Sequence, residues 1–275
     1  MSSTVTALDS THGSPLWHTQ VPLVKDSSGM PRHETVKVVG NILVAEIDGG
    51  QPFLPTELYA LRTDNRALLW KTTESDSCCR GLTVSRDTIS LATIHHLDTF
   101  QASTGRRLWQ YQPDTTNDVI LGITELDSTI YVSTTSLLEG KEGVPRSQMG
   151  KVLALRSSNG TTVWTRPLIS FIVGAASGVL FVQGSTMELE ALRSSDGTQL
   201  WQYKEAGNVL HMFSSTTVVN TTVFVTGDSG FSDSRFADLQ SELERMACFP
   251  PSEQVSSRKD ASRLQAHPHP ALQAH

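Results

Sequence analysis

The sequence has few cysteines and few charged residues, and it has no excess of basic residues. Its 275 residues include three cysteines, too few for the disulfide framework of a small secreted module, so this count leaves the compartment open. Charged residues make up 18% of the chain, below the roughly 25% of an average globular protein. Lys and Arg number 22 against 28 Asp and Glu, a net charge of −6, which argues against a protein that binds nucleic acid by neutralising its phosphates.

Long apolar segments are also missing. The longest nearly apolar stretch, residues 171–182, is shorter than the about 20 residues of a membrane span and is interrupted by glycines. The first residues, MSSTVTALDSTHG, do not show a charged region followed by an apolar one, as an export signal would. We therefore expect no membrane span and no export signal, and a cytoplasmic location for the sequence as written.

What the sequence does contain is a repeat that uses every tryptophan of the chain. Five segments begin with Ala or Thr and end with Trp: ALDSTHGSPLW, ALRTDNRALLW, TFQASTGRRLW, ALRSSNGTTVW and ALRSSDGTQLW. Their tryptophans are Trp17, Trp70, Trp109, Trp164 and Trp201. Four segments carry a glycine in the middle, and these are Gly13, Gly105, Gly160 and Gly197. Such self-similarity is typical of repeat architectures.

Each repeat segment predicts a β-hairpin. Alternating apolar residues lead into the Ala, the glycine supplies a turn with positive φ, and the residues before Trp open a second strand. Two more short strands precede the hairpin, for instance at residues 169–175 and 178–183. Four strands per unit are typical of a propeller blade. The sequence thus predicts an all-β fold, a β-propeller of four-stranded antiparallel blades.

The blade count leaves two alternatives open. Four complete blades end at Trp70, Trp109, Trp164 and Trp201. Residues 4–21 supply only the last two strands of a blade, and residues 210–226 supply only the first two of another. The two halves either join into a fifth blade that closes the ring or remain the ends of an open arc.

The end of the chain follows a different pattern. We divide the chain into propeller repeats at residues 1–230 and a tail at residues 231–275. Phe236, Leu239, Leu243 and Met246 have the spacing of one short amphipathic helix. Beyond that helix the tail is expected to be disordered.

The pattern Ala-x-Asp-x-x-Thr-Gly-x-x-x-Trp resembles the signature repeat of the PQQ-binding-like (quinoprotein alcohol dehydrogenase-like) β-propellers. The resemblance covers residues 5 to about 227. Asp9 matches the acidic position, which other residues replace in the remaining repeats: Arg62, Gln101, Arg156 and Arg193. In this family the Trp resembles a residue that docks between neighbouring blades, which implies a structural role. Relatives usually close with seven or eight blades, which favours the open arc here.

The resemblance also implies where a quinone would bind. In quinoprotein alcohol dehydrogenases a vicinal disulfide lies against the PQQ, at a place similar to that of Cys78 and Cys79 here. The alternative is two thiols in a reducing compartment. The calcium that accompanies PQQ needs carboxylate and amide ligands, and the candidates are isolated in the sequence: Glu46, Asp48, Asn117, Asp118, Glu125 and Asp228. We assign no catalytic residue and expect neither PQQ nor calcium to be bound.

Two adjacent histidines, His95 and His96, lie between two predicted strands and could bind a metal through their imidazole nitrogens. Adjacent strand residues point to opposite faces, so we interpret them as a surface pair and predict no metal site. In the tail, His267, His269 and His275 form a weak metal-affinity tract.

These observations favour a non-enzymatic repeat propeller that binds a protein or a small ligand at its rim or central opening. One alternative is a fragment of a PQQ-dependent alcohol dehydrogenase, which rests on the repeat type and on Cys78 and Cys79. The other alternative is the sensor domain of a larger signalling or envelope protein.

Overall fold

The computed structural model describes ten segments of the chain, and within them every regular element is a strand. These segments are residues 2–22, 34–47, 55–74, 80–115, 117–136, 150–168, 170–184, 188–204, 210–219 and 222–231. The tail predicted at residues 231–275 lies outside them except for Phe231.

Four sheets each contain four consecutive antiparallel strands, which confirms the predicted fold class. Blade 1 contains β3 (Glu34–Val39), β4 (Ile42–Ile47), β5 (Thr56–Arg62) and β6 (Leu68–Glu74). Blade 2 contains β7 (Gly81–Ser85), β8 (Thr88–Ala92), β9 (Leu97–Gln101) and β10 (Arg107–Tyr111). Blade 3 contains β11 (Asp118–Leu126), β12 (Thr129–Ser136), β13 (Gly150–Arg156) and β14 (Thr162–Pro167). Blade 4 contains β15 (Ser170–Ala176), β16 (Val179–Gly184), β17 (Leu189–Arg193) and β18 (Gln199–Tyr203).

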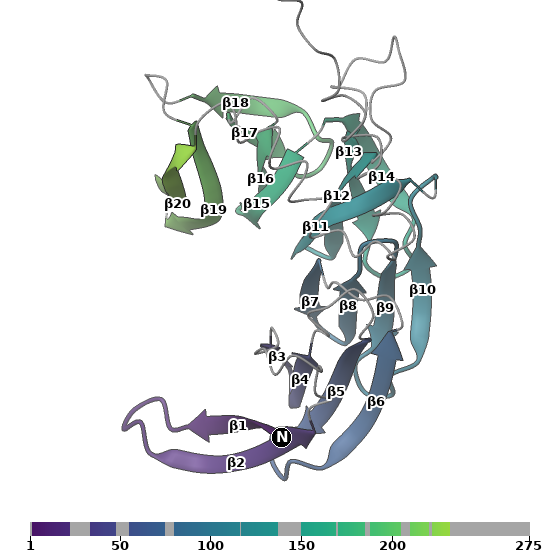
Figure 1. Ribbon diagram of the computed structural model, residues 1–275, viewed down its shortest axis with the longest axis vertical. Helices are drawn as coiled ribbons and strands as arrows, with labels where there is room; N and C mark the ends of the chain where they lie inside the picture. Colours follow the sequence, from purple (N-terminus) through teal and green to yellow (C-terminus); the bar gives the residue numbers. More distant parts are fainter. Residues whose placement is uncertain are drawn as a thin grey trace, which may run out of the picture.

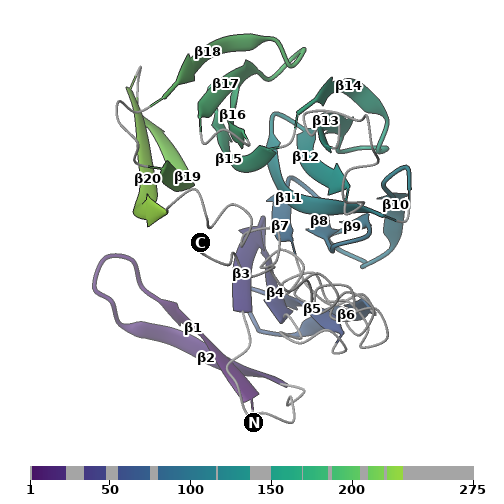
Figure 2. The same ribbon diagram turned by 45° about the horizontal axis from the view of Figure 1, so that its top comes forward.

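Two separate hairpins stand at the ends of this series. The N-terminal hairpin pairs β1 (Ser2–Leu8) with β2 (Pro15–Pro22), and the C-terminal hairpin pairs β19 (Leu210–Val219) with β20 (Thr222–Phe231). They belong to two different sheets, and they do not join into a fifth blade. Figures 1 and 2 show the blades following one another along an open arc, with the two hairpins at its opposite ends.

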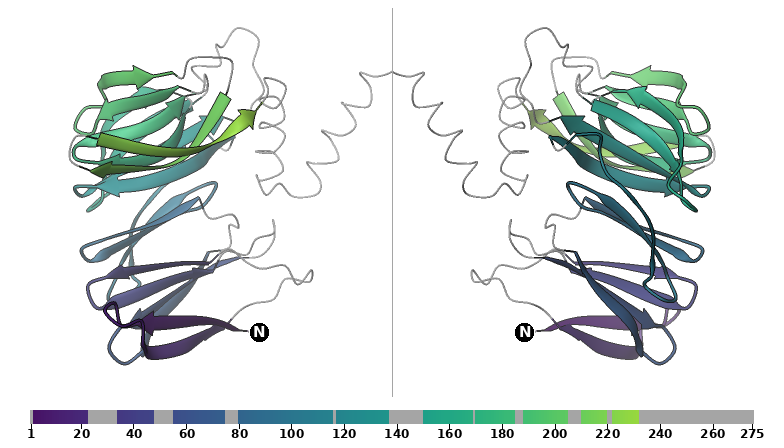
Figure 3. Two further views of the ribbon diagram at one scale, coloured as in Figure 1. Left: turned by 90° about the vertical axis from the view of Figure 1, so that its left-hand side faces the viewer. Right: turned by 90° about the vertical axis from the view of Figure 1, so that its right-hand side faces the viewer.

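The hydrophobic core lies between the blades. Between blades 1 and 2, for example, the buried residues Val44 and Leu58 pack against Leu91 and Phe100 of the next blade. The first strands contact one another along the inner side of the arc, from β3 to β7, β11, β15 and β19. Side views show the sheets stacked on one another (Figure 3). Each complete blade packs against a sheet on both sides. Among the described strands, the hairpin at each end of the arc packs against a sheet on one side only.

The last hairpin of each unit has the same turn. The amide of the fifth turn residue donates to the carbonyl of the first, as from Gly105 to Gln101 at 2.9 Å and from Gly160 to Arg156 at 2.8 Å. This closure places the fifth residue in the left-handed region, where glycine carries no steric penalty. Gly13, Gly105, Gly160 and Gly197 have φ between 68° and 72°. In blade 1 the position is held by Arg66, with φ of 64°.

Candidate functional site

Three tryptophans join each blade to the next. From the outer strand of its blade, each indole Nε1 donates a hydrogen bond to a main-chain oxygen in the turn of the following blade: Trp70 to Ala102 at 2.7 Å, Trp109 to Ser157 at 2.8 Å and Trp164 to Ser194 at 2.9 Å. The bond satisfies the polar atom of a largely covered ring. The repeat tryptophans thus lie at the blade junctions, where the sequence places them.

Each of these indoles also covers the glycine of the next turn. A Cβ added to the glycine would meet the ring at a distance that no real Cβ shows: 2.6 Å at Gly105 against Trp70, 2.7 Å at Gly160 against Trp109 and 2.8 Å at Gly197 against Trp164. The glycine is therefore needed twice, for its positive φ and for the close approach of the ring. Each junction consists of one Trp and one glycine turn.

The two ends of the arc each hold half of such a junction. In the N-terminal hairpin, Gly13 has φ of +68°, and a Cβ there would meet no atom within 4 Å. At the other end Trp201, on β18, packs on one side against Phe181, with ring centroids 6.0 Å apart. Trp201 keeps 40% of its surface exposed. Among the described residues, one end of the arc thus has a glycine turn that no tryptophan covers, and the other end has a tryptophan that covers no glycine turn.

Apolar side chains at the two ends of the arc are exposed where their counterparts in the complete blades are buried. Phe224 on β20 is 56% exposed, whereas the residues at its position in the complete blades are buried: Val44, Ser90, Tyr131 and Phe181. Leu8 at the end of β1 is 55% exposed, and its counterparts are also buried: Leu61, Phe100, Leu155 and Leu192. Among the described strands, β20 pairs with β19 alone and β1 pairs with β2 alone. The repeat pattern is the same in complete and incomplete blades and left a closed ring and an open arc possible, and the usual blade count of the resembling family favoured the open arc.

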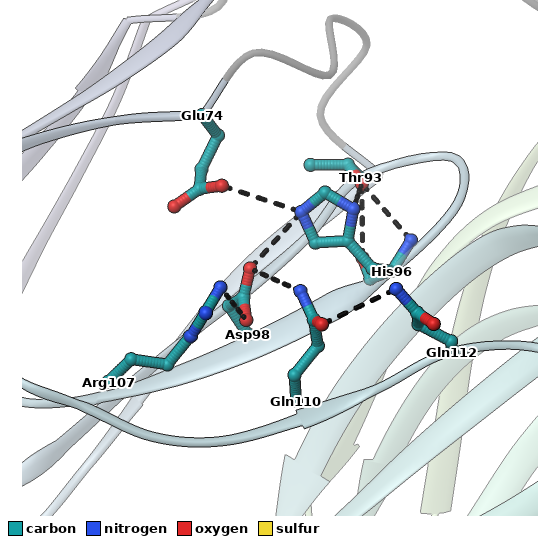
Figure 4. A network of polar contacts seen from close by, with 7 residues as sticks. All are labelled: Glu74, Thr93, His96, Asp98, Arg107, Gln110 and Gln112. Carbon is teal, nitrogen blue, oxygen red and sulfur yellow. Dashed lines mark hydrogen bonds and ion pairs between the residues drawn. The ribbon is translucent and has the colours of Figure 1, made fainter.

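A separate polar cluster lies between blades 1 and 2, and Figure 4 shows it. Glu74 comes from the end of β6, His96 from the turn before β9, and Asp98 from β9 itself. The Nε2 atom of His96 is 3.1 Å from Asp98 Oδ2 and 3.5 Å from Glu74 Oε2. The side chains of His96 and Glu74 are 14% exposed, and that of Asp98 is 0% exposed. These three ligand atoms lie within 4.8 Å of one another.

The neighbours of the cluster hold its groups in place. Thr93 Oγ1 is 3.2 Å from His96 Nδ1 and donates to the His96 carbonyl at 3.1 Å. On the other side, Arg107 and Gln110 of β10 donate to the Asp98 carboxylate at 3.4 and 3.3 Å. The interpretation of His95 and His96 as a surface pair is wrong for His96, because its ring packs inward beside Asp98. The signal that could have found the cluster is the spacing of His96 and Asp98, which places them on one face of a strand.

The candidate contacts of PQQ and calcium are only partly covered by the described residues. Cys78, Cys79 and Asp48 lie outside the described residues. Glu46 is buried on β4, and Glu125 lies on β11, where burial raises the pKa of its carboxyl and nearby hydroxyl groups oppose that rise. Neither belongs to the cluster of potential metal ligands described above.

Asn117 is exposed just before β11, and Asp118 is the first residue of that strand. Asp228 lies on β20. None of the described residues forms an apolar helix long enough to cross a membrane.

Solved structures resemble this arc at low sequence identity. The computationally designed Ika8 protein matches with a TM-score of 0.56 and 12% identity over 82% of this chain and 62% of its own. The outer-membrane assembly protein BamB from Moraxella catarrhalis matches with a TM-score of 0.49 and 14% identity over 81% of this chain and 75% of its own. The quinohemoprotein alcohol dehydrogenase from Comamonas testosteroni matches with a TM-score of 0.48 and 11% identity over 70% of this chain and 38% of its own.

The chain thus spans less than two thirds of the length of the designed protein and of the dehydrogenase. At such identities the likeness to the designed protein shows the fold alone. None of the curated proteins matches the chain.

A family model matches most of the sequence. Its two matches cover residues 1–171 and 139–236, and its description is outer membrane protein assembly factor BamB. Together these ranges include all five tryptophans of the repeat and all four glycines of the turns. The chain therefore belongs to the family of PQQ-like repeat β-propellers whose model is described as outer membrane protein assembly factor BamB.

Proposed function

We propose that the chain is a non-enzymatic interaction scaffold whose two ends bind each other between copies. The C-terminal hairpin of one copy takes up the N-terminal hairpin of a second copy, and together they complete a four-stranded blade. The observation that carries this proposal is that Trp201 and Gly13 are the two halves of a contact that the chain makes three times within itself.

The strand pairing of the complete blades predicts the register of this joint. In each of them the Ala or Thr that begins the repeat segment lies opposite the third residue of the second strand, as Ala60 does opposite Val44 and Ala191 opposite Phe181. The same rule places Ala7 of one copy opposite Phe224 of the other. β20 would then gain a partner on its free edge, as strands do in β-augmentation.

Burial of apolar surface would favour the joint. Leu8, Phe224 and Trp201 are 55%, 56% and 40% exposed, and completion of the blade would cover all three. Apolar surface removed from water stabilises a complex by about 25 cal/mol per Å² before the entropy of association is subtracted. The two surfaces in the joint are different, so the interface is heterologous and can repeat from copy to copy. The family description, an assembly factor, is compatible with such a scaffold role.

The first prediction tests this joint by substitution at glycine. Gly13→Asn keeps a residue type that tolerates positive φ but places a Cβ where the Trp201 ring would lie. In the single copy nothing lies within 4 Å of that Cβ, so folding should be unaffected. Sedimentation velocity over a range of protein concentrations should show that the wild type self-associates and that Gly13→Asn weakens the association at least ten-fold.

Gly40→Asn is the matched control, because Gly40 also has positive φ (+58°) and nothing within 4 Å, but lies in the β3–β4 turn. It should associate like the wild type. A wild type that stays monomeric at all concentrations, or equal association of the two variants, would contradict the proposal.

The second prediction concerns the quinone. We propose that the chain does not bind PQQ, since neither Glu46 nor Glu125, two of the candidate calcium ligands, belongs to the cluster of potential metal ligands found among the described residues. Titration of the full chain with PQQ and Ca²⁺ at micromolar concentration should give no saturable change in the absorbance of the quinone. Saturable binding that disappears in Cys78→Ser/Cys79→Ser would instead favour the fragment of a quinoprotein alcohol dehydrogenase.

A further inference from the structure

We propose that Glu74, His96 and Asp98 form a binding site for a divalent transition metal, with Zn²⁺ as the best match. The site joins two blades, because Glu74 ends the outer strand of blade 1 and the other two residues belong to blade 2. It is independent of the interaction between copies, because it lies at a junction that is complete within one chain.

The geometry of the ligand atoms is close to that of a metal site. Zn²⁺ binds imidazole nitrogen and carboxylate oxygen at about 2.0–2.2 Å, which in a tetrahedral site separates two ligand atoms by roughly 3.4 Å. His96 Nε2 is 3.1 Å from Asp98 Oδ2 and 3.5 Å from Glu74 Oε2. All three atoms lie within 4.8 Å of one another, so a small rotation of the Glu74 side chain brings the third distance into range. Three protein ligands leave the fourth position for water or for an exogenous ligand.

The hydrogen bonds around His96 prepare its Nε2 atom for this role. Thr93 Oγ1 donates to the His96 carbonyl and lies 3.2 Å from His96 Nδ1, so it can accept the proton of Nδ1 in the tautomer that carries one there. In this tautomer the Nε2 lone pair faces the two carboxylates, where a bound cation would offset the repulsion between them. A metal-binding histidine usually donates a hydrogen bond from the ring nitrogen that does not bind the metal, which here is Nδ1.

The carboxylate of Asp98 is held in a similar way. Arg107 contacts Oδ1, and Oδ2, which lies on the side of His96, also accepts a hydrogen bond from Gln110 at 3.3 Å. With a neutral imidazole the two carboxylates and the one guanidinium give the cluster a net charge of −1, which favours a divalent cation. One imidazole with two carboxylates suits Zn²⁺, whereas Ca²⁺ prefers six to eight oxygen ligands.

The third prediction tests this site by competition of the full, metal-free chain with a chromophoric chelator for Zn²⁺. His96→Gln should remove one equivalent of bound Zn²⁺ relative to the wild type. Glu74→Gln should weaken that site by about ten-fold or more, and Thr93→Val, which removes the hydroxyl contacts with the His96 ring and main chain, should weaken it by about 10- to 100-fold. Ca²⁺ should not displace the bound Zn²⁺.

His95→Gln is the matched control, since it removes the adjacent imidazole, which is exposed. It should bind Zn²⁺ like the wild type. The tail histidines are present in every variant and contribute the same background. Equal Zn²⁺ binding by the wild type, His96→Gln and Glu74→Gln would overturn the proposal. If His96→Gln does not fold, Zn²⁺ binding by Glu74→Gln decides between the outcomes. Glu74 is the last residue of β6, so its substitution should leave the fold intact.

Discussion

Replacement of Trp164 by alanine is expected to lower the free energy of unfolding by about 3–5 kcal/mol, the usual loss for a large aromatic side chain in a core. Trp164 packs against Tyr131, with ring centroids 5.9 Å apart, donates to the Ser194 carbonyl and covers Gly197. Truncation removes the two contacts with the turn of blade 4, and it also removes the packing against Tyr131 within blade 3. Urea denaturation followed by circular dichroism, at a protein concentration low enough to keep the chain monomeric, measures the loss. Trp109→Ala should behave in the same way.

The matched comparison is Trp201→Ala, the same repeat position at the open end of the arc. Trp201 is 40% exposed and has packing on one side only, so its loss should be clearly smaller. Trp17→Ala should also be milder, because Arg66 takes the place of the glycine that an indole would cover. Equal losses at Trp164, Trp17 and Trp201 would indicate that the ends are covered as well, as in a closed ring.

The second large effect is expected from alanine at the glycine turns. Gly105→Ala and Gly13→Ala both place a Cβ on a residue with φ near +69°, so both pay the same penalty of about 1–2 kcal/mol for the left-handed conformation. At Gly105 the new Cβ would also lie 2.6 Å from Trp70, and the indole must move away from Ala102. The variant Gly105→Ala should therefore lose about 1–3 kcal/mol more than Gly13→Ala, the typical cost of overpacking.

The same urea titration measures both variants. Because the two turns share their backbone conformation, the difference between them reports the contact with the tryptophan alone. Similar unfolding midpoints for Gly105→Ala and Gly13→Ala would show that the indole of Trp70 does not contact the turn closely in solution.

The sequence was sufficient to predict the strands because they depend on local patterns, whereas the position of the tryptophans between blades was implied by the family resemblance. Alternation of apolar residues defines each strand, and the turn needs a residue that accepts positive φ, which explains the glycine at Gly105 and Gly160. The fold class therefore followed from the residues of one repeat.

The polar cluster could not be predicted in the same way. Glu74 and Asp98 belong to different blades, and no periodic pattern in the sequence relates them. The alternation of side chains along a strand predicts that His95 and His96 point to opposite faces, but it does not predict which of the two faces is covered. That depends on how blade 1 packs against blade 2, which is a property of the tertiary structure.

The repeat pattern alone also did not decide whether the two half-blades join or stay apart. Residues 4–21 and 210–226 have the pattern of half-blades, which is compatible with a closed fifth blade and with an arc. Whether the ring closes depends on the curvature of the series of blades. Packing between blades sets this curvature, and each contact contributes a small part of it. In the structure the arc does not bring β20 and β1 into one sheet.

The claim that the ends of two copies complete one blade is tested most directly by a mixed disulfide. Chains with Ala7→Cys are mixed with chains with Phe224→Cys, both in a background in which Cys78, Cys79 and Cys248 are serine. Residues directly opposite on paired strands have Cα atoms about 4.5–5.5 Å apart, within the range of a disulfide. Val225→Cys, on the opposite face of the strand, replaces Phe224→Cys as the control. The account predicts a mixed covalent dimer from Ala7→Cys and Phe224→Cys and none with the control, whereas a disulfide that forms only when both cysteines are in one chain, or none at all, would contradict it.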